Sequence, residues 1–436
     1  MIGHEARVFL MVFSTKLQEA RNPVRITTLF RKLLCVTSLI LVKGVSLSPV
    51  GLIVRVRPGW RKPRCGRCGK VAPGYDTRPV RRWQHLALGR MVIWLAYAPR
   101  RVQCADCGVL NEEVPWAAGE SRFTWEFEEL AAYLSQITDR TKVTGLLGIA
   151  WLTVGRIVER VVARKLNPGR LDNLRFIGVD EFSYRKRHKY LTVVVDHDRR
   201  RIVWAKEGRS YEVLKEFFQT LGVERCFKIE AATIDMAGGY EKAIQEWLPQ
   251  AEVVFDRFHV QKLASDALDE VRRSIVRELH GSPEEASEVK GTRFVLLKKP
   301  EDLSGAEKVK LSEVQRTNRR LYRAYLLKET LGAALDYAQP KRAEGALRRW
   351  IGWAVRSRLK PFVRTARTIR RHFDGVLAYV KTRLTNGLVE GINNKLRMIA
   401  RRAFGFHSAG ALIGSLFLSC GGIELNPPIP SNPLEC

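Results

Sequence analysis

The sequence predicts a multidomain α/β protein. We expect an N-terminal zinc-ribbon-like β module, a helix-turn-helix, and an α/β core that a large helical insertion interrupts. Three observations support this: two CxxC pairs among strand-like segments, a helical pattern after them, and strand-like runs that give way to an Arg-rich helical stretch. The expected divisions are 1–40 (extension), 41–115 (zinc-binding, DNA-binding module), 116–170 (helix-turn-helix), 171–259 with 383–420 (core), 260–382 (helical insertion) and 421–436 (Pro-rich tail).

The charge balance is strongly basic. The 436 residues include 75 Lys and Arg against 45 Asp and Glu, a formal net charge of +30. Such a field favours a polyanionic partner, nucleic acid before an anionic membrane; the alternative is a protein that is merely alkaline. The most apolar run, LLCVTSLILV, is shorter than the about 20 residues of a membrane-spanning helix, and the first residues lack a signal-peptide pattern. We therefore expect no membrane partner and a cytoplasmic location.

Four cysteines form two closely spaced pairs, each followed by glycine. These are Cys65, Cys68, Cys104 and Cys107. A two-residue spacer lets both thiolates of a pair reach one tetrahedral zinc ion; the alternative is two unlinked turns with free thiols. Segment 33–58 reads as short strands, and the interval between the pairs leaves room for a β-hairpin or two. We expect His85, within that interval, to face the surface or DNA rather than the metal.

The interval between the cysteine pairs is also basic. Between Arg61 and Arg101 there are eleven Lys or Arg against one acid. Basic residues with interleaved aromatic residues suit contact with phosphates. We expect Arg81 and Arg82, which flank Trp83 on one side, to contact DNA.

Segment 124–165 has helical periodicity. Apolar residues recur at helical spacing, and a Gly-containing turn precedes the last helix. This is the outline of a three-helix helix-turn-helix, with 151–162 as the recognition helix and Arg156 and Arg160 as DNA contacts. The alternative is an ordinary helical linker domain.

Two aspartates follow apolar strand-like runs in the core. Segment 174–207 reads as three antiparallel strands, and Asp180 lies in the first of them; Asp235 ends a fourth strand and precedes a Gly-Gly turn. An acid at the end of a buried strand is costly unless it binds something. Two such oxygen ligands on adjacent strands can share Mg²⁺ or Mn²⁺.

One acid interrupts a basic segment near the C-terminus. Glu390 lies in NGLVEGINNKLRMIARRAFGF, for which we expect a helix over 387–402. On that helix Glu390 could complete a two-metal site, beside neighbours that hold the DNA backbone. These neighbours are Asn393, Asn394, Lys395, Arg397, Arg401 and Arg402.

Other interpretations of these acids stay open. Glu390 could simply be a salt-bridge partner within a basic helix. Glu181 and Asp196 compete for the role beside Asp180, and Asp256 also ends a predicted strand, the fifth. We expect His259 to be a structural or substrate-contacting residue rather than a metal ligand.

Taken in order, these motifs resemble the ISL-three type of insertion-sequence transposases. The resemblance runs from about residue 40 to about 415 and rests most on FDRFHV and TNGLVEGINNKLRMIARRAFGF, with GVDEFSYRK, TIDM and KGTRFVLLKKPEDL between the zinc pairs and the last motif. It implies a ribonuclease-H-like catalytic core with a DDE triad. Carried over by motif, Asp180, Asp235 and Glu390 match the three acids, and 260–382 matches the insertion between the second and third.

The resemblance implies a cut-and-paste DNA transposase that binds terminal inverted repeats and target DNA. It also implies Mg²⁺ (or Mn²⁺) at the acids, at least a homodimer in synapsis, and a place at the nucleoid of a bacterial cell. One alternative is a non-catalytic DNA-binding repressor or inactive transposase remnant, which makes no demand on the acids. Another is a nuclease with the same core but no strand transfer.

Overall fold

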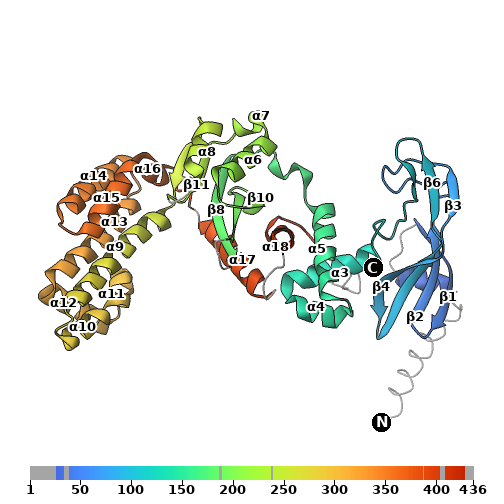
Figure 1. Cartoon of the computed structure of the whole chain (residues 1–436), viewed down its shortest axis with the longest axis horizontal. Coiled ribbons are helices and arrows are strands. Elements are labelled where there is room, and N and C mark those ends of the chain that lie inside the picture. Colours follow the sequence, from blue (N-terminus) through green and yellow to red (C-terminus); the bar gives the residue numbers. More distant parts are fainter. Residues whose placement is uncertain are drawn as a thin grey trace, which may run out of the picture. The chain divides into compact units, whose positions relative to one another are not determined.

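A computed structural model describes residues 26–33, 39–185, 189–236, 239–385, 387–402 and 408–427, without the side chains of 31–33, 185, 388–390, 393, 400 and 402. The chain divides into two units, and Figure 1 labels the helices and strands of both. The first comprises the residues up to Ile137, Val143–Val161 and those from Leu425 onward; the second comprises Thr138–Lys142 and Val162–Glu424. No helix in the described ranges is long and apolar enough to cross a bilayer.

The first unit begins with β-structure. A short helix, α2 (Ile26–Leu33), precedes two sheets. The four-stranded sheet has the order β1-β2-β5-β4, with β1 (Ile40–Ser48), β2 (Gly51–Pro58), β5 (Met91–Tyr97) and β4 (Arg81–Leu88). The three-stranded sheet has the order β3-β6-β7, with β3 (Gly74–Thr77), β6 (Arg100–Cys104) and β7 (Gly108–Asn111). The strands predicted before and between the cysteine pairs are therefore present.

The start of β2 requires glycine, and two tryptophans fill the core beside it. Gly51 begins β2 with a φ of +117°, and a Cβ there would lie 2.3 Å from the Val92 carbonyl oxygen. Only glycine meets both demands without strain. Trp83 and Trp116 fill the core of the four-stranded sheet, with ring centroids 5.5 Å apart in an edge-to-face arrangement.

Three helices follow the sheets, as the periodicity predicts. They are α3 (Trp125–Ile137), α4 (Arg140–Leu147) and α5 (Trp151–Lys165). The α5 residues at helical spacing, Val154, Ile157 and Val161, are fully buried. Gly148, with a φ of +64°, forms the turn between the last two helices.

The second unit contains a five-stranded mixed sheet in the order β10-β9-β8-β11-β12. Its strands are β8 (Phe176–Arg185), β9 (Lys189–Asp196), β10 (Arg201–Glu207), β11 (Ala231–Ile234) and β12 (Glu252–Phe255). The first three are antiparallel, as predicted, whereas β11 and β12 run parallel to β8. A 3-10 turn (Pro168–Leu171) leads into the sheet, and α6 (Tyr211–Leu221), α7 (Val223–Cys226) and α8 (Tyr240–Trp247) connect its strands.

Helices cover both faces of this sheet. Ile177, Val179 and Val194 pack into the same core as α6 and α8. Side chains alternate along a strand, so the residues between them point to the other face. There α17 (Gly387–Arg402) contacts β8, and α18 (Ala409–Cys420) contacts β10. Figure 1 shows α6 and α8 on one side of β8 and α17 on the other.

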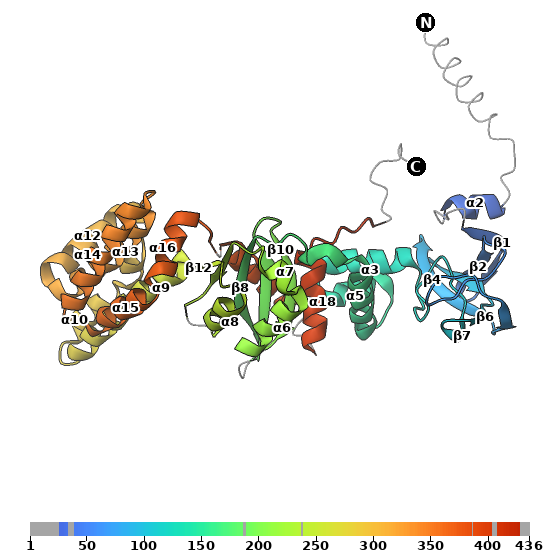
Figure 2. The ribbon, with the colours of Figure 1, turned by 90° about the horizontal axis from the view of Figure 1, so that it is seen from above.

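Residues 257–382 form helices beside the sheet, as the sequence predicts for 260–382 (Figure 2). They are α9 (Arg257–Glu278), α10 (Pro283–Lys290), α11 (Arg293–Leu297), α12 (Gly305–Thr317), α13 (Arg319–Asp336), α14 (Pro340–Arg356), α15 (Lys360–Arg371) and α16 (Phe373–Thr382), with a 3-10 turn at Pro300–Asp302.

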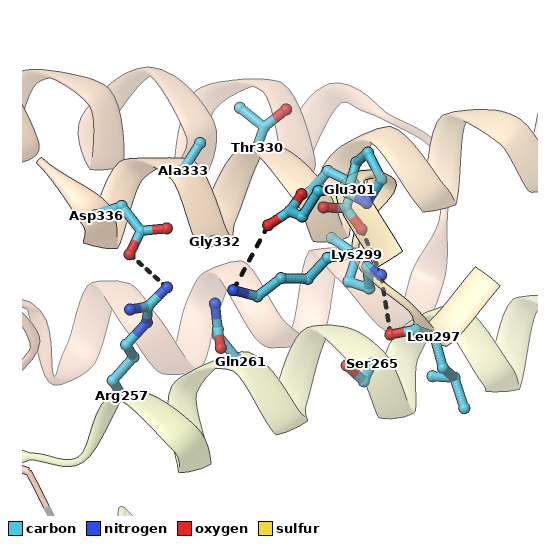
Figure 3. A pocket seen from close by; sticks show the side chains of 13 residues that line it. Arg257, Gln261, Ser265, Leu297, Lys299, Glu301, Thr330, Gly332, Ala333 and Asp336 are labelled. Atoms are coloured by element: carbon cyan, nitrogen blue, oxygen red, sulfur yellow. Dashed lines mark hydrogen bonds and ion pairs between the residues drawn. The ribbon is translucent and has the colours of Figure 1, made fainter. Parts of the chain in front are cut away.

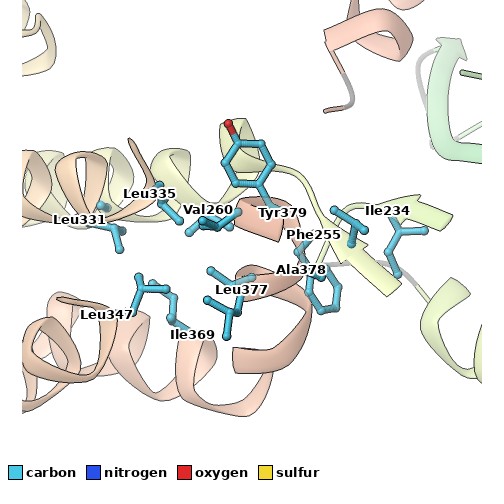
Figure 4. Packing of buried hydrophobic residues seen from close by; sticks show 14 of the residues in the cluster. Ile234, Phe255, Val260, Leu331, Leu335, Leu347, Ile369, Leu377, Ala378 and Tyr379 are labelled. Carbon is cyan, nitrogen blue, oxygen red and sulfur yellow. The ribbon is translucent and has the colours of Figure 1, made fainter. Parts of the chain in front are cut away.

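The sheet and these helices share one hydrophobic core. Figure 4 shows Ile234 and Phe255 of the sheet continuing into Leu377 of α16 and the helices beyond it. The join is tight at Gly375, where a Cβ would lie 2.4 Å from Cδ2 of Phe255. The helical insertion is therefore packed against the sheet and is not a detached lobe.

Candidate functional site

The register of the parallel strands aligns three aspartates. Thr233 pairs with Gly178, and two residues further along both strands are Asp235 and Asp180. Ile234 pairs with Phe255, so Asp256 follows β12 at the same level. β8 continues past Asp180 to Arg185, but all three acids lie level with the carboxyl ends of β11 and β12, where open α/β sheets place ligands.

The three aspartates have different surroundings. Asp180 is half-buried, its Oδ1 accepts from the Glu181 amide at 2.7 Å, and alternation points it to the face that α17 contacts. The Asp235 side chain is 34% exposed, with Oδ2 lying 3.4 Å from His259 Nδ1. Asp256 is only 3% exposed and precedes α9. Asp180 and Asp235 are therefore the accessible pair.

The other two rivals lie elsewhere. Asp196 pairs with Ile177 toward the opposite edge, where its Oδ1 accepts from the amides of Asp198 (2.9 Å) and Arg199 (3.1 Å) in a turn. Glu181 pairs with Thr192 and points to the face covered by α8. Burial raises its pKa, Arg209 at 4.0 Å lowers it, and the negative charge of Asp235 raises it further. Neither shares the position of Asp180.

The third predicted acid lies on α17. The helix spans 387–402 as expected, and Glu390 is in its first turn, but its side chain lies outside the described residues, as do those of Asn393 and Arg402. Ile392 and Leu396 are buried. Other predicted DNA contacts are exposed: the Arg397 guanidinium donates to Asn394 Oδ1 at 2.9 Å, Lys395 donates to the Ser419 carbonyl at 2.8 Å, and Arg401 is also on the surface.

The four paired cysteines meet in space. The sulfur atoms of Cys65, Cys68, Cys104 and Cys107 all lie within 4.8 Å of one another. The amides of Cys68 and Arg67 donate to the Cys65 sulfur and lower its pKa to about 7, whereas burial raises the pKa of Cys107 to about 12. Four thiolates so close together would repel one another, and a bound cation would offset this repulsion and favour their deprotonated form. The donor set fits zinc.

Two expectations for the neighbouring strands change. His85 is 5% exposed and its Nδ1 lies 2.8 Å from Thr124 Oγ1, so the expectation that it faces the surface or DNA was wrong. Burial lowers its pKa to about 4. Arg81 donates to the carbonyls of Gly119 (2.8 Å) and Ser121 (2.6 Å), so its end nitrogens are engaged within the protein. Arg82 is exposed.

The two arginines predicted on the recognition helix also differ. Arg156 is exposed on α5. Arg160 instead donates from Nε (2.8 Å) and Nη2 (2.5 Å) to Glu128, which is fully buried on α3 and also accepts from Ser121 Oγ at 2.6 Å. Arg160 therefore holds α3 and α5 together.

A cavity of about 440 Å³ lies among α9, α13 and the segment around Leu297 (Figure 3). Arg257, which follows Asp256, pairs there with Asp336 at 2.5 Å. The lining has three basic and three acidic side chains, so its charges balance. The Arg257–Asp336 ion pair joins the start of α9 to the end of α13, so we interpret this cavity as structural. No sequence pattern signalled this pair, because its members are far apart along the chain.

Comparisons with known proteins agree with these features. Residues 177–415 match a family model described as a transposase, of the ISL3 DDE type, and residues 112–162 match the helix-turn-helix domain of transposase family ISL3. The chain is 39% identical over 395 residues to the transposase for insertion sequence element IS1557 of Mycobacterium tuberculosis, covering 85% of this chain and 89% of that protein.

A second relative is more distant. The transposase for insertion sequence element IS1001 of Bordetella parapertussis is 29% identical over 357 residues, which cover 81% of this chain and 88% of that protein. The matched regions include the sheet with its aligned aspartates, the helical insertion and the helix-turn-helix. The chain therefore belongs to the ISL3 family of DDE transposases, enzymes that cleave and join DNA.

Proposed function

We propose that this chain moves its own insertion sequence by a cut-and-paste reaction at one ribonuclease-H-like site. The alignment of Asp180 with Asp235 at the carboxyl edge of the sheet carries this proposal. Three antiparallel strands followed by two parallel ones, with acids at that edge, support the ribonuclease-H-like assignment. Glu390 on α17 would complete the triad, because α17 contacts β8, the strand of Asp180.

The side chains at this edge suit a hard divalent cation. Carboxylate oxygens are ligands that Mg²⁺ and Mn²⁺ accept. When bound, two such ions would activate water for cleavage and then a 3′ hydroxyl for strand transfer, two in-line displacements at phosphorus. Asp180 and Asp235 would hold these ions with Glu390, and His259 would orient Asp235 through the 3.4 Å contact.

The first unit would recognise the terminal inverted repeats. Its zinc-binding module and α5 would supply the DNA contacts, with Arg82 and Arg156 exposed for this purpose. Asn393, Asn394, Lys395, Arg397, Arg401 and Arg402 of α17 would hold backbone near the acids. Synapsis of two ends implies at least a homodimer.

The decisive experiment measures excision from a plasmid that carries the element, alongside binding to a terminal-repeat duplex. Asp180→Asn, Asp235→Asn and Glu390→Gln keep size and hydrogen bonding but remove a metal-binding charge. We expect each to abolish excision and leave repeat binding unchanged. Asp198→Asn is the matched control, because Asp198 is exposed in the turn beside Asp196, toward the opposite edge, and it should retain excision.

Other outcomes point to the alternatives. If Glu390→Gln excises normally and Asp256→Asn does not, Asp256 is the third acid. If the intact chain binds repeats but never cleaves them with Mg²⁺ or Mn²⁺, it acts as a repressor or an inactive remnant. If it releases ends without joining them to target DNA, it is a nuclease.

A further inference from the structure

The helical insertion divides sharply in charge. Residues 260–318 contain eleven Lys or Arg and eleven Asp or Glu, whereas residues 341–383 contain thirteen Lys or Arg and only two acids, Glu344 and Asp374. The described structure places the second segment on α14, α15 and α16. A solvated helix face normally mixes both signs. The excess therefore calls for a partner of opposite charge.

The basic residues of α15 form one stripe. Phe362, Ala366 and Ile369 are buried, and the opposite face carries cations at intervals of three or four residues. These are Lys360, Arg364, Arg367 and Arg371, all exposed. Attraction to the negative end of the helix dipole would explain only the basic residues in the last turn of α15.

Few of these charges are neutralised within the chain. Arg364 pairs with Glu270 at 2.5 Å, and Arg348 of α14 pairs with Glu344 at 2.9 Å. Among the described residues, no acid forms an ion pair with Arg367, Arg370 or Arg371. An internal role as ion-pair partners does not explain these three.

A small cavity lies beside the stripe. It measures about 320 Å³ and is lined by Arg348, Ile351, Arg370 and Phe373. The Arg348 guanidinium lies over the Phe373 ring, 4.8 Å from its centroid, and donates from Nε (3.1 Å) and Nη2 (2.9 Å) to Glu344. Arg370 borders the same hollow and forms no ion pair with an acid among the described residues, so its guanidinium is the one there that suits a phosphate.

The end of α15 also lies near the strand that precedes Asp256. His372, directly after α15, packs its ring on Phe255 with centroids 4.9 Å apart, and Phe255 immediately precedes Asp256. DNA leaving the carboxyl edge of the sheet could therefore continue along α15. At 1.5 Å per residue its 12 residues extend about 18 Å, or roughly five base pairs at 3.4 Å each.

We propose that Arg367, Arg370 and Arg371, called the basic face, bind the backbone of duplex DNA next to the cleavage site. The contact is separate from the helix-turn-helix and the cysteine module. Its ligands would be backbone phosphates, to which guanidinium groups donate paired hydrogen bonds. The inference rests on the proposed function in placing the cleavage site at the carboxyl edge.

The test compares two triple variants made on the Asp180→Asn chain, so that cleavage plays no part. Arg367→Gln with Arg370→Gln and Arg371→Gln changes the basic face. Arg277→Gln with Lys308→Gln and Arg316→Gln is the matched control: these residues are exposed, lie on α9 and α12 in the charge-balanced segment, and remove the same charge. Affinity for a terminal-repeat duplex is measured against KCl concentration.

We expect the slope of log affinity against log salt to become shallower by between about 1 and 3 for the basic-face variant, since each phosphate contact contributes about 0.9. The control should keep the slope of the parent. Removing about five base pairs on one side of the cleavage site should weaken the parent but not the basic-face variant. Equal losses in both triple variants, or equal effects of shortening, would overturn the proposal.

Two further outcomes would assign the basic face to a different role. Binding to vesicles that contain anionic lipid, lost in the basic-face variant while DNA binding is unchanged, would assign the face to a membrane instead. Both triple variants should unfold at the same temperature, and a lower Tm for the basic-face variant alone would assign these arginines to the stability of the fold.

Failure of the proposed reaction would be distinguishable from failure of this inference. It would appear as no excision by the unmodified chain, with the salt dependence of DNA binding unaffected.

Discussion

His259 Nδ1 lies 3.4 Å from Asp235 Oδ2, joining the first turn of α9 to the end of β11. We propose that the imidazole orients the carboxylate that we place at the metal. We predict that His259→Ala lowers the cleavage rate about 10- to 100-fold, the usual effect of losing a residue that orients a ligand. Single-turnover cleavage across a range of Mg²⁺ concentrations measures this.

The matched variant is His259→Asn, whose amide can still donate to Asp235. It should recover part of the rate and require less Mg²⁺ than His259→Ala. Equal activity of all three proteins would show that the contact does not position Asp235.

The cysteine cluster predicts one zinc ion per chain. Purified protein should contain about one equivalent of zinc by elemental analysis, because four sulfur atoms within 4.8 Å satisfy one tetrahedral ion. Cys65→Ser or Cys104→Ser should remove the ion and destabilise the first unit, since both residues belong to a buried cluster. Cys226→Ser, which alters a buried cysteine outside the cluster, should keep the zinc.

Because His85 is buried, we predict that the first unit loses stability in acid. Burial lowers its pKa to about 4, whereas the unfolded value is about 6.5. Protonation therefore favours the unfolded state. The contribution of neutral His85 is fully present above pH 6.5 and is lost as the pH falls toward 4, by roughly 3 kcal/mol at the limit.

Asn at this position can keep a hydrogen bond to Thr124 without gaining a proton. Denaturation of the zinc-loaded protein from pH 7.5 to 4.5 should show a steeper loss for the parent than for His85→Asn. Zinc release in acid affects both proteins, so only the difference between them reports on His85. Parallel curves would contradict the prediction.

Arg156 and Arg160 should separate DNA binding from stability. Arg160→Ala leaves the buried Glu128 carboxylate without its cationic partner, so we expect a loss of about 3–5 kcal/mol in unfolding free energy. Arg156→Ala removes an exposed cation and should weaken repeat binding with little change in Tm. Thermal unfolding and DNA titration on the same samples distinguish the two effects. A stable Arg160→Ala that loses only DNA binding would contradict this assignment.

Gly375 should tolerate no side chain. A Cβ would lie 2.4 Å from the Phe255 ring and 3.0 Å from the Val253 carbonyl oxygen. We expect Gly375→Ala to destabilise the second unit by about 1–3 kcal/mol, as measured by urea denaturation. Gly410→Ala on α18 is the control, because a Cβ there meets nothing within 4 Å. It should be neutral or stabilising by up to about 1 kcal/mol.

Local patterns predicted much of the architecture. Period-two runs and tight turns indicated the antiparallel strands β8 to β10, helical spacing indicated α5, and the predicted helix at 387–402 matches α17. The prediction omitted α6, although its apolar residues at helical spacing, including Leu214 and Phe218, carried a readable signal. These features depend on neighbours along the chain, which is why sequence patterns reveal them.

The surroundings of individual side chains were less predictable. Asp235 and Asp256 both follow short apolar strands, yet one is accessible and the other is buried. His85 is buried, and its Nδ1 forms a hydrogen bond with Thr124, 39 residues further along the chain. Arg160 lies on the predicted recognition helix, but its guanidinium forms an ion pair with the buried Glu128. Each outcome depends on contacts between distant segments, which no local pattern encodes.

The packing of α16 on β12 also affects what an interrupted round of protein synthesis would produce. The ribosome releases a chain from its N-terminus, so the cysteine module and α5 emerge long before Gly375 can seat against Phe255 and before Glu390 is made. A product that stops within the insertion would keep the parts proposed to grip DNA ends and lack the third acid. If the first unit binds the terminal repeats as proposed, such a product would compete with the full-length enzyme for these repeats without cleaving them.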